Sequence, residues 1–367
     1  MLGLPCYPDR LPVIAYYVSG HGYGHAIRSN EVARHLLRLL PDATILFRGG
    51  APAWLFPPHP RIHVSTAQLD CGVAESPDAL RIDAAATVAA LRQFLTARRQ
   101  IIREEAAFLQ SQKANIVVAD IPYLAGPAAH AAGLSSIGIS NFTWNWIIEP
   151  FAESEPELTT RIRDGYSRME TLLRLPFFHH EGMEMFPEIL DMPLLAGQPS
   201  RSRESVRHEF HAHGRPLVWI ALRGNINAAA VQRAASSCPD TLFLTTDSSL
   251  DGLAGNLRLF RIADNLTVSD VVAACDAVVG KLGYSLVSEC VAAKTRLVMI
   301  PRTGFREDPI TETEASRFTV LEPMPYEDYL TGRWRSYLDA ALSRPVPHAS
   351  APLGGASACA RFIASRL

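Results

Sequence analysis

Residues 12–36, PVIAYYVSGHGYGHAIRSNEVARHL, combine an apolar run, a glycine-rich turn and a helical pattern. The run from Pro12 to Val18 predicts a buried strand, and residues 31–40 predict the amphipathic helix that follows it. A second stretch, DAVVGKLGYSLVSECVA at 276–292, repeats the same order of strand, turn and helix. Units of this kind build parallel sheets covered by helices, so the sequence predicts an α/β fold.

The rest of the chain continues this alternation in two halves, separated by a segment at 150–205 that is rich in Pro, Glu and Met. Further strands are predicted at 44–47, 115–119, 136–139, 217–222, 241–245, 257–261, 277–279 and 296–300. Further helices are predicted at 84–110, 125–132, 228–236, 268–274, 285–293 and 357–365. We therefore predict two doubly wound parallel-sheet domains facing a cleft, with ligands beyond the carboxyl ends of the strands.

Composition excludes several classes of protein. The 367 residues are 48% hydrophobic and 20% charged, as in ordinary globular proteins, and the net charge of −2 argues against a nucleic-acid partner. The N-terminus lacks the layout of a signal peptide, and no run approaches the roughly 18 apolar residues of a membrane span. The six cysteines are widely spread, so we expect reduced thiols and a cytoplasmic protein.

The first glycine-rich turn has Gly20, Gly22 and Gly24 with His21 and His25 between and after them. This G-x-G-x-G spacing differs from a dinucleotide fingerprint, and no P-loop lysine follows it. A neutral imidazole is suited to take a proton from a hydroxyl, so either histidine is a candidate general base; the alternative is a turn histidine bonded to backbone. Asp120, which ends a predicted strand, is a candidate to orient the base or, alternatively, a helix N-cap. Arg28 is either a surface residue or a phosphate contact.

The second turn places Gly280, Lys281 and Gly283 before a helix. A helix N-terminus attracts anions, and Lys281 is one of only three lysines among 35 basic residues, so the turn is a candidate diphosphate site. The alternative is a solvated surface lysine. Glu289, one to two turns into the helix, is a candidate acceptor for ribose hydroxyls or, alternatively, a surface glutamate.

Two weaker signals lie at other predicted strand ends. Gly224 and Asn225 form a third candidate phosphate turn, and Arg306 belongs to a charged loop after the strand at 296–300. The sequence has no HExxH pattern, no clustered Cys/His motif and no GxSxG nucleophile elbow, so we expect no metal site and no serine hydrolase.

Four stretches carry a family resemblance, at 16–36, 117–146, 175–195 and, most specifically, 276–309. In this order they resemble glycosyltransferases of the GT-B type, and more closely the glycosyltransferase-like N-terminal region of L-arabinokinases. A more distant similarity is to the N-acetylglucosaminyltransferase of peptidoglycan synthesis. The sequence departs from plant natural-product transferases because it lacks the histidine of their HxGxxS-type donor box.

The resemblance implies GT-B architecture with an N-terminal Rossmann-like acceptor domain at 1–185, a linker at 186–205 and a C-terminal nucleotide-sugar domain at 206–345. It also implies that a C-terminal helix within 346–367 packs back on the N-terminal domain. Among the candidate donor-binding residues, the resemblance implies Ile262, Ala263, Gly280, Lys281, Gly283, Ser285 and Glu289, while Gly224, Asn225, Tyr284, Ser288 and Arg306 are candidates from their places in the sequence. Among the candidate acceptor-binding residues it implies Gly22 and Gly24, while Gly20, Tyr23, Arg28, Asn141 and Trp144 are candidates from their places in the sequence. The resemblance also places His25 on the acceptor side, and His25, His21 and Asp120 are the candidate catalytic residues.

The expected activity is transfer of a sugar from a nucleoside-diphosphate sugar, with a UDP sugar favoured, to a hydroxyl or amine acceptor. We expect the transfer to be metal-independent and inverting, with no cofactor besides the nucleotide sugar as co-substrate and a small molecule or glycan as acceptor. Two alternatives stay open at this point: a UDP-sugar epimerase on the same fold, and a sugar-nucleotide-binding module without catalysis.

Overall fold

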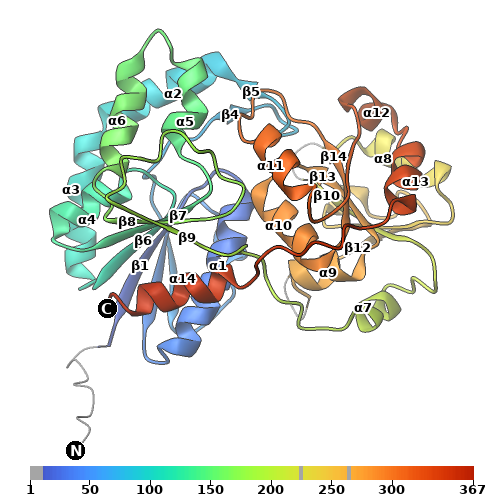
Figure 1. The fold of residues 1–367 in the computed structure, drawn as a ribbon, viewed down its shortest axis with the longest axis horizontal. Coiled ribbons are helices and arrows are strands. Elements are labelled where there is room, and N and C mark those ends of the chain that lie inside the picture. The colour runs from blue at the N-terminus through green and yellow to red at the C-terminus, as the bar shows by residue number, and fades with distance from the viewer. Residues whose placement is uncertain (1–10, 223–225, 263–265) are drawn as a thin grey trace, which may run out of the picture.

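The computed structural model describes residues 11–222, 226–262 and 266–367. Two parallel sheets lie side by side, each covered by helices on both faces (Figure 1). We refer to the seven-stranded sheet with its helices as the N-terminal domain, and to the six-stranded sheet with its helices as the C-terminal domain.

The sheet of the N-terminal domain has the strand order β3-β2-β1-β6-β7-β8-β9, and all of its pairs are parallel. Its strands are β1 (Val13–Val18), β2 (Thr44–Gly49), β3 (Ile62–Thr66), β6 (Ile116–Asp120), β7 (Ser136–Ser140), β8 (Thr171–Arg174) and β9 (Glu188–Asp191). The helices of this domain are α1 (Tyr23–Leu39), α2 (Ala84–Thr96), α3 (Arg98–Ser111), α4 (Ala125–Ala132), α5 (Trp144–Ile148) and α6 (Pro156–Tyr166), with short 3-10 turns at Ala53–Leu55 and Glu149–Phe151. A two-stranded antiparallel hairpin, β4 (Ala74–Glu75) and β5 (Ile82–Asp83), precedes α2.

The sheet of the C-terminal domain has the order β12-β11-β10-β13-β14-β15, again parallel throughout. Its strands are β10 (Leu217–Ala221), β11 (Leu242–Thr245), β12 (Leu257–Leu259), β13 (Ala277–Lys281), β14 (Arg296–Ile300) and β15 (Leu321–Pro323). Its helices are α7 (Arg203–Glu209), α8 (Ala228–Ser237), α9 (Val268–Ala274), α10 (Tyr284–Ala293), α11 (Asp308–Ala315), α12 (Tyr326–Thr331) and α13 (Arg335–Ser343), with a 3-10 turn at Ser248–Leu250. The predicted pair of doubly wound parallel sheets is thus confirmed.

Alternation along β1 shows how each sheet buries two faces. Ile14 and Tyr16 pack in the core with α1, whereas Ala15 and Tyr17 pack in the core with α3 and α4. A parallel strand buried on both faces carries a nearly continuous apolar run, because successive side chains point to opposite faces. This is why residues 13–18 were recognisable as a strand from sequence alone.

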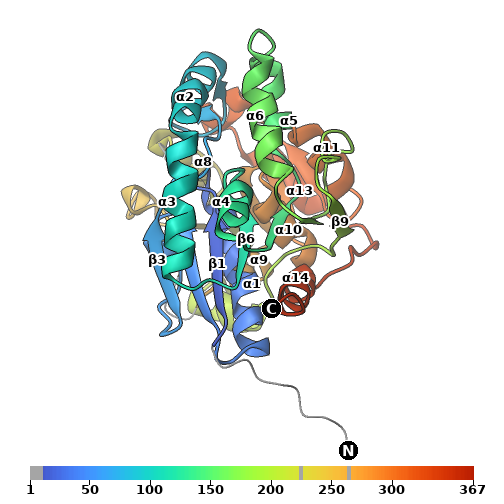
Figure 2. The same ribbon diagram turned by 90° about the vertical axis from the view of Figure 1, so that its left-hand side faces the viewer.

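The last helix, α14 (Gly355–Ala364), packs against α1 of the N-terminal domain (Figures 1 and 2). Leu194 anchors the approach, because its N–H donates to Pro352 O at 2.7 Å and its carbonyl accepts from Gly355 N at 3.1 Å. A Cβ at position 355 would lie 2.3 Å from Pro193 O, so glycine is required for this close contact. The end of the chain is therefore part of the N-terminal domain's core.

Some elements differ from the sequence-based expectations. The single helix predicted at 84–110 is two helices, because Ala97 N bonds Phe94 O in a tight 3-10 turn and the Thr96 hydroxyl bonds Gln93 O. Helix α1 begins at Tyr23, eight residues before the predicted start; β9 lies within the linker predicted at 186–205, and α7 begins in that linker and ends beyond it.

Two further findings concern the described part of the chain. No helix there is long and apolar enough to cross a membrane. Of the five cysteines in it, all have free thiols, four of them buried; Cys6 lies outside the described residues.

Candidate functional site

The two glycine-rich turns meet where the domains face each other. The hydroxyl of Ser285, in the first turn of α10, donates to Gly24 O at 2.9 Å. A Cβ on Gly24 would lie 2.8 Å from that hydroxyl oxygen, so the glycine allows the two backbones to approach. The carboxyl ends of β1 and β13 therefore lie at one junction, which is where ligands bind in open α/β sheets.

A buried charge network lies on the N-terminal side of this junction. His25 Nδ1 is 2.8 Å from Asp120 Oδ1, and Arg28 binds the same carboxylate with Nε at 2.6 Å and Nη2 at 2.5 Å. Ser29 donates to Asp120 Oδ2 at 3.2 Å, and Arg28 Nη1 donates to Asn141 Oδ1 at 3.3 Å. The structure thus brings together five predicted or neighbouring polar residues from α1, β6 and the end of β7.

Asp120 is ionised in this network. Burial alone raises the pKa of Asp120, but the Arg28 guanidinium and the His25 ring outweigh burial and hold that pKa below its ordinary value. We assign a proton to His25 Nδ1, the atom that contacts the carboxylate, which leaves the lone pair on Nε2. The N-cap of α4 is Leu124, so the alternative interpretation of Asp120 as a helix cap is wrong.

A second histidine–carboxylate contact joins the two domains. His21 Nε2 lies 3.4 Å from Glu75 Oε1, on β4, and Lys281 Nζ of the C-terminal domain lies 3.5 Å from the same oxygen. Lys281 Nζ also donates to Ala79 O at 3.4 Å. The side chains of Glu75 and Lys281 are only 12% and 19% exposed, so the alternative interpretation of Lys281 as a solvated surface lysine is wrong.

A buried carboxyl group, that of Asp70, lies next to the aromatic ring that packs on His21. It accepts a hydrogen bond from Trp144 Nε1 at 3.0 Å, and Trp144 packs edge-to-face on His21 with ring centroids 5.0 Å apart. Burial raises the pKa of Asp70, while Ser19, His25 and Trp144 oppose that rise. Sequence reasoning missed both Asp70 and Glu75, because Asp70 lies in the loop after the unrecognised strand β3 and Glu75 on the two-residue strand β4, and neither belongs to a motif.

Comparisons with known proteins match this architecture. A model of the family "Glycosyl transferase family 1" matches residues 13–311. The chain belongs to glycosyl transferase family 1. The enzyme class predicted from the sequence, a nucleotide-sugar-dependent glycosyltransferase, is the class of this family.

Individual relatives agree with the family. A protein of Arabidopsis thaliana named L-arabinokinase is 31% identical over 340 residues, which are 90% of this chain but 32% of that protein. This chain therefore spans about a third of the length of that relative.

Among solved structures, the glycotransferase of kitacinnamycin has a TM-score of 0.60 at 14% identity, covering 98% of this chain and 100% of its own. A UDP-glucose: anthocyanidin 3-O-glucosyltransferase in complex with UDP has a TM-score of 0.58 at 13% identity, covering 98% and 99%. The resemblance to L-arabinokinases and the GT-B fold are confirmed.

Within this glycosyltransferase, the residues predicted for the donor are spread over several environments. Gly283 is the N-cap of α10, and a Cβ at this position would meet no atom within 4 Å, whereas Gly280 packs against Leu286 and Ala221 within the sheet–helix contact. Glu289 is buried and accepts from Gly197 N at 2.8 Å, so it is no surface glutamate. Tyr284, Ser288 and Ile262 are buried or half-buried, and Gly224, Asn225 and Ala263 lie outside the described residues.

Arg306 contacts the N-terminal domain. It donates to Glu149 Oε2 at 2.8 Å and to Trp146 O at 2.9 Å, and its guanidinium lies 4.6 Å from the centre of the Trp146 ring. This predicted donor residue thus binds protein groups across the junction.

The residues predicted for the acceptor all lie in the N-terminal domain. Gly20 lies against Gly50, in the loop that follows β2, and Gly22 precedes α1 in the left-handed region at φ 88°. Tyr23 is 36% exposed and packs edge-to-face on Trp54, which is 63% exposed. Trp144 is buried, with its indole N–H held by Asp70, and Asn141 and Arg28 belong to the buried network. Arg28 is 3% exposed, so the interpretation of it as a surface residue is wrong.

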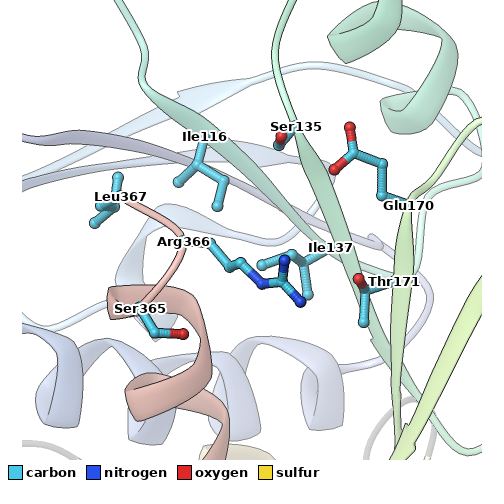
Figure 3. A pocket seen from close by; sticks show the side chains of 8 residues that line it. All are labelled: Ile116, Ser135, Ile137, Glu170, Thr171, Ser365, Arg366 and Leu367. Carbon is cyan, nitrogen blue, oxygen red and sulfur yellow. The ribbon is translucent and has the colours of Figure 1, made fainter.

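A separate recess of about 370 Å³ lies at the amino ends of strands β6, β7 and β8 of the N-terminal sheet (Figure 3). It is lined by Ile116, Ser135, Ile137, Glu170, Thr171, Ser365, Arg366 and Leu367. These residues begin strands or end the chain, so the recess is remote from the carboxyl ends of the strands. No group of three or more His, Cys, Asp or Glu side chains suited to a metal ion occurs within 11–222, 226–262 and 266–367.

Proposed function

We propose that this glycosyltransferase moves a sugar from a nucleoside-diphosphate sugar, with a UDP sugar as first choice, to a hydroxyl or amine acceptor. The transfer is a single displacement that inverts the anomeric carbon and uses no metal ion. The observation that carries the proposal is the His25–Asp120 contact at 2.8 Å, next to Gly24, whose carbonyl accepts from Ser285 in the first turn of α10.

His25 is the general base of the proposal. Its Nε2 takes the proton of the acceptor while the acceptor oxygen or nitrogen forms a bond to the anomeric carbon. Asp120 orients the ring through Nδ1 and stabilises the imidazolium that results, as in other histidine–carboxylate pairs. Arg28 keeps Asp120 ionised, so the pair is prepared before any ligand arrives.

The C-terminal domain stabilises the leaving group. As the bond between the anomeric carbon and the phosphate oxygen breaks, negative charge develops on the diphosphate. The N–H groups at the start of α10 and the Lys281 ammonium supply positive potential there, which is electrostatic stabilisation without a metal. Glu289, on the same helix, is the proposed ribose contact, and the UDP bound to a structural neighbour supports uracil as the base.

A screen for turnover tests the proposal. UDP, dTDP, GDP, ADP and CDP sugars are incubated with a broad acceptor panel, with and without EDTA, and the released nucleoside diphosphate and the product anomer are measured. We expect a β-linked product from an α-linked donor, activity that survives EDTA, and loss of activity in His25→Ala. His63→Ala, at an exposed position on β3, is the matched control. Interconversion of the donor sugar without an acceptor would instead indicate an epimerase. Full activity of both His25→Ala and His21→Ala would refute the proposal that a histidine is the general base.

A further inference from the structure

The carboxylate of Glu75 lies between the two halves of the proposed reaction. Its Oε1 is 3.4 Å from His21 Nε2 of the N-terminal domain and 3.5 Å from Lys281 Nζ of the C-terminal domain. No other carboxylate in the ion pairs of the described residues contacts both glycine-rich turns. The position of this side chain therefore needs an explanation.

The hairpin that carries Glu75 is fixed against the C-terminal domain. Thr303 N donates to Leu80 O at 2.8 Å, and Ile82 N donates to Thr303 O at 3.1 Å. Leu80 is 1% exposed and packs in the core of the C-terminal domain, and Tyr326 donates to Asp78 Oδ2 at 2.6 Å. These contacts give Glu75 a defined place beside Lys281.

Glycosyl transfer requires the sugar to lie in this same place. The sugar leaves a phosphate held near Lys281 and reaches an acceptor oxygen held near the histidines, so it must bridge the two turns. A group within ion-pair distance of both turns is in position to contact that sugar. A carboxylate accepts hydrogen bonds from two hydroxyls at once, and it attracts positive charge that develops at the anomeric centre.

We propose that Glu75 binds the transferred sugar, accepting hydrogen bonds from its hydroxyls when the diphosphate of the donor takes over Lys281. This inference rests on the proposed function and adds a substrate class to it. The negative charge of Glu75 selects a neutral hydroxylated sugar and rejects a uronic acid, whose carboxylate would lie beside it.

The position predicts two opposite effects of one substitution. Glu75 and the diphosphate compete for Lys281, so Glu75→Gln strengthens the binding of UDP alone, by roughly threefold to tenfold. The same change removes the ionised acceptor of the sugar hydroxyls, so the additional affinity of UDP-glucose over UDP disappears. We expect turnover to fall by roughly 100-fold.

Calorimetry with UDP, UDP-glucose and UDP-glucuronate on the full chain tests this inference, together with turnover of the two donors. Glu149→Gln is the matched control, because it removes one carboxylate from another ion pair across the junction. Wild type should discriminate against UDP-glucuronate, Glu75→Gln should lose that discrimination, and Glu149→Gln should retain it. Thermal denaturation verifies folding, and Glu75→Asp, which withdraws the charge by one methylene, should keep the discrimination against the uronate while losing affinity for UDP-glucose.

The outcomes separate the two proposals. If Glu75→Gln strengthens UDP and UDP-glucose equally and keeps full turnover, Glu75 is only a counter-ion of Lys281, and the inference is overturned alone. If no nucleotide sugar binds to the wild type, the proposed function fails, and this inference fails with it.

Discussion

Arg28 and Asp120 are both fully buried, and each compensates the charge of the other. Burying an ion costs several kcal/mol unless a partner and further hydrogen bonds satisfy it. Ser29, Asn141 and His25 supply those bonds, so the network serves stability as well as the proposed chemistry. A loss of activity after a change here must therefore be separated from a loss of folding.

Substitution Asp120→Asn tests this separation. It leaves the Arg28 guanidinium buried without its counter-ion, so we expect the free energy of unfolding to fall by roughly 3–5 kcal/mol and turnover by roughly 1,000-fold or more. The double variant Arg28→Met/Asp120→Asn removes both charges and should regain most of the stability, measured by urea denaturation, without regaining turnover. Recovery of turnover in the double variant would show that Asp120 has no role beyond balancing Arg28.

The pKa of Glu289 makes a prediction about pH. Burial raises the pKa of this carboxyl to about 7 from its ordinary value of 4.5, although the Gly197 N–H opposes the rise. The folded state thus holds the proton more tightly than the unfolded state. The stabilisation is complete below about pH 4.5 and is lost as the pH rises through 7, amounting to about 3 kcal/mol at most.

Glu289→Gln should remove that pH dependence. The amide oxygen can still accept from Gly197 N but never ionises, so the variant should be more stable than wild type at pH 8 and similar to it at pH 5. Urea denaturation at the two pH values measures the difference, and nucleotide affinity measured alongside reports on the proposed ribose contact. Parallel stability curves for the two proteins between pH 5 and 8 would contradict the raised pKa.

At the scale of elements, the strands buried on both faces were predictable and the amphipathic or short elements were not. Residues 13–18, 116–120 and 296–300 form nearly uninterrupted apolar runs, which is the pattern of parallel strands. By contrast, β3 has mostly exposed side chains, because it is the edge strand of its sheet, and the sequence gives no comparable signal. β8 and β9 lie in the segment at 150–205, whose prolines and glutamates do not indicate strands.

The same distinction explains which site residues could be predicted. His21, His25, Asp120 and Lys281 follow or end recognisable strands, and the fold brings such positions to one edge. Glu75 and Asp70 lie in the segment at 67–83, between β3 and α2. Their partners His21, Lys281 and Trp144 are distant in sequence. The packing of Leu80, the Thr303 hydrogen bonds and the Tyr326–Asp78 hydrogen bond fix this segment against the C-terminal domain, and a single sequence does not reveal those contacts.

The contact between the two glycine-rich turns is testable at the scale of these elements. Gly24→Ala places a methyl group 2.8 Å from Ser285 Oγ and 3.1 Å from Ser285 Cβ, so the hydroxyl must turn away or the turns must separate, and either change breaks the hydrogen bond to Gly24 O. We expect turnover to fall roughly 10- to 100-fold, since a displacement of about 1 Å is costly for catalysis, with a small change in melting temperature. Gly24→Ala/Ser285→Gly removes the clash and should restore turnover; failure to restore it would show that the Ser285 hydroxyl itself is needed.

At the scale of the whole molecule, several long-range contacts tie the two domains together. They include the packing of α14 on α1, the insertion of Leu80 into the C-terminal core, and the Arg306 contacts with Trp146 and Glu149. One core cluster also combines Leu36 of α1, Ile363 of α14 and Tyr284 of α10. Because apolar burial continues from one domain to the other, we expect the chain to unfold as one cooperative unit.

Ile363→Ala tests this cooperativity. Ile363 is completely buried, so its truncation should lower the free energy of unfolding by about 2–4 kcal/mol, whereas Leu353→Ala, at a position that is 56% exposed, should change it by less than about 0.5 kcal/mol. In urea, far-ultraviolet circular dichroism and tryptophan fluorescence should shift together, because buried tryptophans lie in both domains, Trp144 and Trp146 in the N-terminal one and Trp219 and Trp334 in the C-terminal one. Two separate transitions, with only the first moved by Ile363→Ala, would show that the domains unfold independently and that α14 stabilises one of them alone.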